Sequence, residues 1–223
     1  MTNIQERIEI INSLLLKGTP QYITYAALEC RLTIESIVYD RSKLSLDKMS
    51  QSEVPWQPKK LINQIQREEN NLVTEGLTIS KSKKPINNNK LPFSKEYFES
   101  QEYVKKGEQA HLNINKMSSF YNALSHLALH TKNPKTSNDS IIIYGDVVKT
   151  KKKVNEVLNE LEKMKDCNLL IGGGGEEYSF ECVTCNTQVI RKIRALTAGK
   201  VIHCNGNECA ESYLISFSDG DFY

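Results

Sequence analysis

The sequence predicts a mainly α-helical protein, in which an N-terminal helical bundle is followed by a small β-rich module. Apolar residues recur at the three-and-four spacing of a buried helix face through most of residues 1–165. After the glycine run at 172–175, short β-rich segments alternate with two pairs of closely spaced cysteines. We therefore expect the bundle at residues 1–168, a glycine linker at 169–177 and the β-rich module at 178–223.

The first three helices of the bundle are expected before residue 76. An apolar stripe near the N-terminus stops at Gly18-Thr19-Pro20, which offers a left-handed cap and then a residue that cannot continue a helix. The second helix is expected at about residues 21–44. Pro58 suits the first turn of the third helix, and Trp56 just before it is a candidate apolar anchor.

Residues 76–95 are predicted to form a mobile basic loop, because they contain five lysines, two prolines and no acidic residue. Ser94 is a candidate N-cap for a fourth helix at about residues 95–110. The fifth and sixth helices are expected at about residues 115–130 and 146–165, each with one apolar face.

The strongest chemical signal is the cysteine spacing in the C-terminal module. Cys182-Val-Thr-Cys185 is followed, after eighteen residues, by Cys204-Asn-Gly-Asn-Glu-Cys209. Each pair can supply two thiolates from one tight turn, and four thiolates form the tetrahedral site of structural zinc. With the flanking β-rich segments, this pattern is typical of a zinc ribbon. It predicts one structural Zn²⁺ per chain on Cys182, Cys185, Cys204 and Cys209, with no open coordination position for a substrate.

Disulfides or four unrelated buried thiols are the alternative explanations of these cysteines. The opening Met1-Thr-Asn-Ile-Gln-Glu-Arg7 does not resemble a secretory signal, so we expect a cytoplasmic protein, in which reduced cysteines favour metal over disulfides. His203 is an alternative ligand to Cys204, but Cys204 preserves the four-thiolate set. Cys30 and Cys167 are expected to be buried free thiols.

Composition limits the possible functions without selecting one. The net charge of +2 is too small to indicate a nucleic-acid partner, and no apolar run approaches the ~18 residues that span a bilayer. The glycine run lacks the Lys-Ser or Lys-Thr and the helix of a phosphate-binding loop, which favours a flexible linker. The sequence also lacks paired catalytic carboxylates, a nucleophile elbow and dinucleotide or ATP fingerprints.

Three motifs stand out in the helical part of the sequence. They are Ala26-Ala-Leu-Glu-Cys-Arg-Leu-Thr-Ile-Glu35, Trp56-Gln-Pro-Lys-Lys-Leu-Ile62 and Phe120-Tyr-Asn-Ala-Leu-Ser-His-Leu-Ala-Leu-His130. They resemble the Leu-Glu-Leu-Arg helix, the Trp-x-Pro-Lys segment and the Tyr-x-x-x-(Gly/Ser)-x-x-x-His helix of a family of uncharacterised bacterial proteins, similar in style to the HEPN all-helical superfamily. Over residues 1–165 the resemblance implies a helical bundle, a homodimer and a setting in antiphage defence or related conflict systems.

The HEPN resemblance also supplies a test for ribonuclease activity. Active members use an Arg followed four to six residues later by a His, so that both side chains share one helix face. This chain lacks such a pair, which argues against a ribonuclease of that type. If the helical part holds a catalytic site, the positions that match the family motifs are Arg31, Glu35, Tyr121 and His130. Internal polar ties between helices are the other explanation of these four residues.

His126 and His130 lie four positions apart on the expected fifth helix, which is the spacing of metal-binding pairs. Leu127 stands where a zinc-protease motif needs Glu. A close helix contact or a dimer face therefore explains the pair better than a second metal.

Two classes of function remain. The first is a non-enzymatic nucleic-acid-binding or adaptor component of a defence-type system, or a module that only docks on other proteins. The second is a nuclease-like enzyme at the four motif positions in the helical part, for which a shared solvent-accessible cleft would count in favour. Basic clusters attract phosphates through counterion release. The predicted nucleic-acid contacts are Arg191, Lys192, Arg194, Lys200, Lys81, Lys83 and Lys84.

Overall fold

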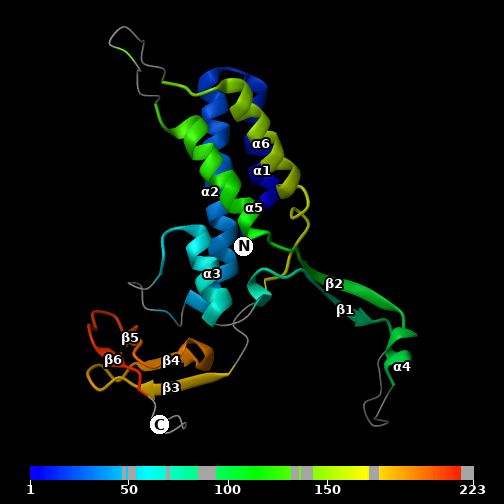
Figure 1. Cartoon of the computed structure of the whole chain (residues 1–223). Coiled ribbons are helices and arrows are strands. Elements are labelled where there is room, and N and C mark those ends of the chain that lie inside the picture. The colour runs from blue at the N-terminus through cyan, green and yellow to red at the C-terminus, as the bar shows by residue number, and fades with distance from the viewer. Residues whose placement is uncertain are drawn as a thin grey trace.

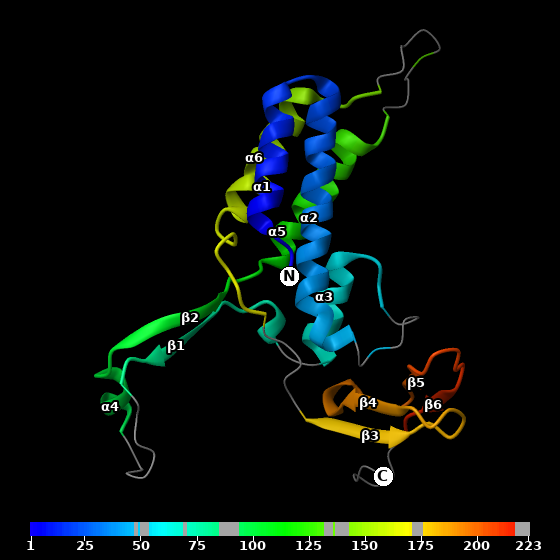
Figure 2. The ribbon, with the colours of Figure 1, turned by 180° about the vertical axis from the view of Figure 1, so that it is seen from behind.

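The computed structural model of the chain describes residues 1–46, 49, 54–68, 71–84, 94–131, 136, 143–170 and 176–216. An elongated helical bundle forms its N-terminal part, and a two-stranded hairpin and a β-rich module extend from one end of the bundle to different sides (Figure 1 and Figure 2). The predicted mainly α fold with a small β part is confirmed. None of the helices among the described residues combines the length and apolar character needed to cross a membrane.

The bundle is organised around its longest helix. Its helices are α1 (Ile4–Lys17), α2 (Pro20–Leu46), α3 (Pro58–Glu68), α5 (Ile114–Leu124) and α6 (Val147–Leu161). Helix α2 packs against each of the other four. Fully buried apolar side chains from all five helices form one core, and they include Ile11, Ile34, Leu61, Leu124 and Leu161.

Local capping residues fix several helix ends, and the end of α1 at Gly18 and the start of α6 lie where the sequence predicts them. The side chain of Asn3 accepts a hydrogen bond from the Glu6 N–H at 3.1 Å, and α1 ends at Gly18 with φ of 71°. Helix α6 begins after its N-cap Asp146 but ends at Leu161, earlier than expected. The fifth helix is α-helical only to Leu124, and residues Ser125–Leu129 continue it as one π-helical turn.

The predicted fourth helix at 95–110 is wrong, and so is the predicted loop over residues 77–82. Strand β1 (Leu77–Ser82) pairs antiparallel with β2 (Tyr103–Gln109), and α4 (Lys95–Glu99) is one short helix after the Ser94 cap. Along β2, alternate residues Gly107 and Gln109 are buried, which is a strand pattern and not a helical one. Residues 85–93 of the predicted loop and 171–175 of the predicted linker lie outside the described residues.

The C-terminal module consists of two antiparallel hairpins. Strand β3 (Glu177–Glu181) pairs with β4 (Gln188–Lys192), and β5 (Val201–His203) pairs with β6 (Ser212–Leu214). A 3₁₀ turn, η5 (Ile193–Ala195), follows β4. The module has its own small core, formed by buried Val189, Leu196 and Ile202 together with two of the cysteines, Cys182 and Cys204. The strands fall where the β-rich segments were expected.

Candidate metal centre and helical cleft

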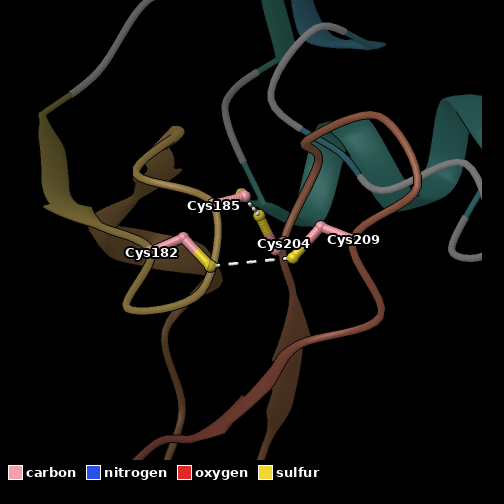
Figure 3. Close-up of side chains that lie close together, drawn as sticks. All are labelled: Cys182, Cys185, Cys204 and Cys209. Carbon is pink, nitrogen blue, oxygen red and sulfur yellow. Dashed lines mark hydrogen bonds between the residues drawn. The ribbon is translucent and has the colours of Figure 1, made fainter.

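Four cysteine sulfurs meet between the two hairpins of the C-terminal module (Figure 3). The Sγ atoms of Cys182 and Cys209 lie 3.7 Å apart, and those of Cys185 and Cys204 lie 3.5 Å apart. All four sulfurs lie within 4.8 Å of one another. Four thiolates at ~2.3 Å from one tetrahedral ion lie about 3.8 Å apart. The predicted group can therefore hold a metal ion, and all six cysteines of the chain are free thiols.

The backbone of the two cysteine-bearing turns allows the turns to approach each other closely. In the first turn, Asn186 adopts φ of 58° and its N–H donates to the Cys182 carbonyl at 2.9 Å. In the second turn, the Gly206 N–H donates to Cys204 Sγ at 3.3 Å. A Cβ atom at position 206 would lie 2.8 Å from Cys185 Sγ, so this position requires glycine.

Tyr213 of β6 links the second hairpin to the first cysteine turn. Its hydroxyl donates to Cys182 Sγ at 3.1 Å and accepts from the Val183 N–H at 3.1 Å. The hydrogen bond from Tyr213 lowers the pKa of Cys182, whereas burial raises the pKa of Cys204. A thiol with a lowered pKa is more readily present as thiolate, the form that binds a metal.

A second candidate site is a cavity of about 670 Å³ between α2, α3 and α5. Its volume lies within the roughly 300–1,000 Å³ of typical small-molecule sites. Arg31 and Tyr121 line it from α2 and α5, and Lys59 and Lys60 line it from the first turn of α3. We call this cavity the helical cleft.

Three of the four predicted catalytic candidates form a connected polar cluster at the wall of the helical cleft. The Arg31 guanidinium donates to the Tyr121 hydroxyl and lies over the Tyr121 ring, 4.1 Å from its centroid. The Tyr121 hydroxyl in turn donates to Glu35 Oε1 at 2.6 Å, and this oxygen is 3.7 Å from Arg31 Nη2. Burial and the hydrogen bond to Glu35 raise the pKa of Tyr121, so its hydroxyl keeps its proton at neutral pH.

The fourth candidate, His130, reaches the same cleft from the end of the fifth helix. It lines the cavity with Arg31 and Tyr121, whereas His126 does not. The π-helical turn ends just before His130, whose backbone is extended with φ of −123°. His126 lies within the π-helical turn and His130 follows its end, so the two histidines do not share one helix as the sequence predicted.

The cations on α3 and the indole before it were missed as binding residues by sequence reasoning. Trp56, predicted as an apolar anchor, is 72% exposed and lines the cleft. Lys59 and Lys60 are also exposed. Pro58 of the same motif is buried, whereas Trp56, Lys59 and Lys60 face the solvent. The juxtaposition of an aromatic residue and two lysines within five positions was the signal available in the sequence.

Two basic residues of β4 that were predicted to contact nucleic acid are buried. Arg191 is 5% exposed and Lys192 is 4% exposed. The Arg191 guanidinium donates to the His203 carbonyl, and Lys192 Nζ lies 2.7 Å from Glu177 Oε1. These partners disfavour phosphate contacts by Arg191 and Lys192. Arg191 links the first hairpin to the second, whereas Lys192 pairs within the first hairpin.

The remaining predicted contacts are distributed over two parts of the chain. Lys200 Nζ donates to Glu68 Oε1 at 3.0 Å, and Lys83 Nζ lies 2.8 Å from Glu102 Oε2. Arg194, Lys81 and Lys84 are exposed. The predicted basic surface is thus divided between the β1–β2 hairpin and the C-terminal module.

His203 and the two cysteines outside the sulfur group, Cys30 and Cys167, have other surroundings. His203 Nδ1 lies 2.7 Å from Ser212 Oγ across the β5–β6 pair, and Cys204 supplies the fourth sulfur of the metal-capable group. Cys30 is buried in the bundle, and burial raises its pKa to about 12. Cys167 is only half-buried.

The chain matches no family model, no curated protein and no solved structure. The HEPN-like resemblance therefore remains a prediction from three motifs.

Proposed function

We propose that the C-terminal module is a zinc ribbon that holds one structural Zn²⁺ on Cys182, Cys185, Cys204 and Cys209. Support comes from the sulfur spacing and from the two hairpins, each of which presents one cysteine pair. Zinc prefers a four-thiolate set of this kind, and four protein ligands leave no position for a substrate. Elemental analysis of the purified chain should give one zinc per chain.

We further propose that the protein is a non-enzymatic binding protein for single-stranded nucleic acid. One observation carries this proposal: the helical cleft combines the exposed indole of Trp56 with the cations of Arg31, Lys59 and Lys60. Proteins that bind single strands without sequence preference combine aromatic platforms for the bases with cations for the backbone. The cleft replaces the buried β4 residues as the main proposed contact, and exposed Lys81 and Lys84 remain secondary candidates.

A nuclease-like enzyme is the second candidate, because Arg31, Tyr121 and His130 share the helical cleft. Against it, the Glu35 carboxylate already accepts from Tyr121 and pairs with Arg31, so it is not a free general base. Incubation of the same oligonucleotides with the protein, followed by gel analysis, separates the candidates. Cleavage that His130→Ala abolishes would establish the enzyme, and intact oligonucleotides would leave the binding protein.

The binding proposal is tested by fluorescence anisotropy with single-stranded RNA, single-stranded DNA and duplex DNA over a salt series. For single strands, log K falls against log salt with a slope of about 0.7 per neutralised phosphate. The double variant Lys59→Glu/Lys60→Glu should weaken binding and reduce this slope by about 1–2. The matched control is Lys151→Glu/Lys152→Glu, which makes the same charge change at exposed positions of α6 outside the helical cleft.

Two results would reject this proposal. If none of the three nucleic acids binds, the protein-docking alternative replaces it, and capture of protein partners becomes the appropriate experiment. If both double variants weaken binding equally, the interaction depends on overall charge and the helical cleft is not the site.

The resemblance supports two further proposals, a homodimer and a role in a bacterial defence-type system. Light scattering on the purified chain tests the first. Loss of phage resistance on deletion in a host that carries the gene tests the second.

A further inference from the structure

The helical cleft carries an excess of positive charge on its described lining. Arg31, Lys59 and Lys60 contribute basic side chains, and no aspartate or glutamate is among the described lining residues. Lys59 and Lys60 form no ion pair with any residue that the structure describes. Glu35 lies 3.7 Å from Arg31 and offsets one of the three positive charges, so the excess comes from Lys59 and Lys60. The charge therefore favours an anionic ligand.

Arg31 is held in place at the wall of the cleft. Its guanidinium is fixed by the Tyr121 hydroxyl and by stacking on the Tyr121 ring. The Arg31 side chain is 22% exposed and lines the cleft. Because guanidinium groups bind phosphate oxygens through charge-assisted hydrogen bonds, the exposed part of this side chain can contact a phosphate in the cleft.

Trp56 supplies an aromatic surface on the same cleft. Its residue is 72% exposed, although its backbone is tethered where the Tyr39 hydroxyl donates to the Trp56 carbonyl at 3.4 Å. An exposed indole on an anchored backbone offers a flat face on which a nucleobase can stack. The cleft thus combines a base platform with a cationic pocket in a volume of about 670 Å³.

We propose that the helical cleft recognises a nucleotide unit that ends in a phosphate monoester, with the phosphate against Arg31 and the base on Trp56. A monoester carries about −1.5 to −2 charges at pH 7, whereas an internal phosphodiester carries about −1. The basic side chains of the cleft outnumber the one nearby acid, Glu35, and this excess therefore favours the end of a strand over its interior. This inference rests on the proposed nucleic-acid binding and names the group that is bound. The monoester has two possible sources, a free nucleoside monophosphate and the phosphorylated end of a strand.

The test compares three single-stranded oligonucleotides of one sequence, with a 5′-phosphate, a 3′-phosphate or only hydroxyl ends, binding to the full chain. At least one phosphorylated oligonucleotide should bind about tenfold tighter than the hydroxyl form, the effect of one additional charge-assisted hydrogen bond. Competition with adenosine, cytidine, guanosine and uridine monophosphates distinguishes the sources. If a free nucleotide displaces the oligonucleotide at concentrations near the Kd of that nucleotide, the ligand is a free nucleoside monophosphate. If no free nucleotide displaces the oligonucleotide, the ligand is the phosphorylated end of a strand.

Arg31→Lys should remove most of the preference for the phosphorylated oligonucleotide, because a lysine cannot reproduce the fixed guanidinium. Arg7→Lys is the matched control, since Arg7 pairs with Glu29 away from the cleft lining. Because Arg31 also anchors Tyr121, the thermal unfolding of each variant is measured. If Arg31→Lys does not fold, Lys60→Gln at an exposed position makes the same test and should reduce the preference several-fold.

The outcomes separate this inference from the proposal on which it rests. Equal binding of all three oligonucleotides overturns the monoester inference and leaves single-strand binding intact. Tight binding of a free nucleotide without binding of any oligonucleotide supports the monoester inference and overturns single-strand binding. Absence of both overturns both.

Discussion

Glu68, the last residue of α3, accepts a hydrogen bond from Lys200 Nζ at 3.0 Å and so joins the bundle to the C-terminal module. Lys200 Nζ also donates to the Ala195 carbonyl at 3.0 Å, within the module itself. The opposite end of α3 carries Lys59 and Lys60 into the helical cleft. One helix of 11 residues therefore lines the helical cleft at one end and contacts the C-terminal module at the other.

Glu68→Gln should weaken the contact between the bundle and the module. The Glu68 side chain is 11% exposed, and the variant leaves the Lys200 ammonium without its charged partner. We expect a loss of about 1–3 kcal/mol in the free energy of unfolding, measured by chemical denaturation. Glu102→Gln is the control, because the Lys83–Glu102 pair is exposed and should contribute only about 0–1 kcal/mol. Equal effects of the two variants would contradict a specific docking contact.

Cys185→Ser should abolish stoichiometric zinc binding, because three thiolates and a hydroxyl form a much weaker site. Elemental analysis after gel filtration is the measurement, and the intact chain should lose its C-terminal thermal transition on addition of a chelator. Cys167→Ser serves as the control, since Cys167 lies outside the sulfur group. Retention of one zinc by Cys185→Ser would refute the proposed ligand set.

Gly206→Ala should also impair zinc binding, although it removes no ligand. The added methyl group would lie 2.8 Å from Cys185 Sγ and 2.7 Å from Thr187 Oγ1, so the second cysteine turn must shift. The expected result is a zinc affinity between those of the wild-type chain and Cys185→Ser, measured by competition with a chelator. Gly199→Ala separates steric from conformational effects, because Gly199 has φ of 79° but no atom near its missing Cβ.

Tyr121→Phe should remove the hydrogen bond that fixes the Arg31 side chain without creating a cavity in the core. The ring under the guanidinium is kept, but the hydrogen bonds to Arg31 and Glu35 are lost. We expect a destabilisation of about 0.5–1.5 kcal/mol by denaturant titration. Tyr25→Phe, at an exposed position on the same bundle, should change stability by less. An unchanged free energy of unfolding for Tyr121→Phe would mean that the hydrogen bonds of the polar cluster do not stabilise the bundle.

Protonation of the Asp40 carboxylate should make the bundle less stable in acid. Burial alone would raise the pKa of Asp40, but hydrogen bonds from Lys43 and Thr2 outweigh burial and hold the pKa below its ordinary value of 3.8. A carboxyl with a depressed folded pKa contributes stability that is complete above pH ~4 and is lost as pH falls through the folded pKa. Asp40→Asn should therefore narrow the difference in unfolding free energy between pH 7 and pH 3. Asp166→Asn, which removes an exposed carboxylate, is the control for the loss of one negative charge.

Local signals predicted the elements that short-range chemistry controls. The stop at Gly18 and the cysteine turns depend on residues within one turn of the chain, and the structure has both. The β1–β2 hairpin was missed because its pairing joins residues 77 and 109, across a segment that resembles a loop. Ser94 correctly marked a helix start, but no local signal marked its end at Glu99.

The site residues show the same division. The resemblance motifs selected Arg31, Glu35 and Tyr121, which the structure joins by hydrogen bonds. The prediction that Arg191 contacts nucleic acid considered its charge but not its position in a strand. It lies two residues after buried Val189, and alternation therefore directs it to the same inner face.

The small core of the C-terminal module includes Cys182 and Cys204, the same side chains that the zinc-ribbon proposal assigns as ligands. On the zinc-ribbon proposal, loss of the ion would leave protonated thiols and remove the link between the two hairpins, so that the small core around Val189, Leu196 and Ile202 would have to hold the module together alone. Metal starvation in a cell should then expose residues 176–216 to proteases, and the abundance of the protein would follow the supply of zinc.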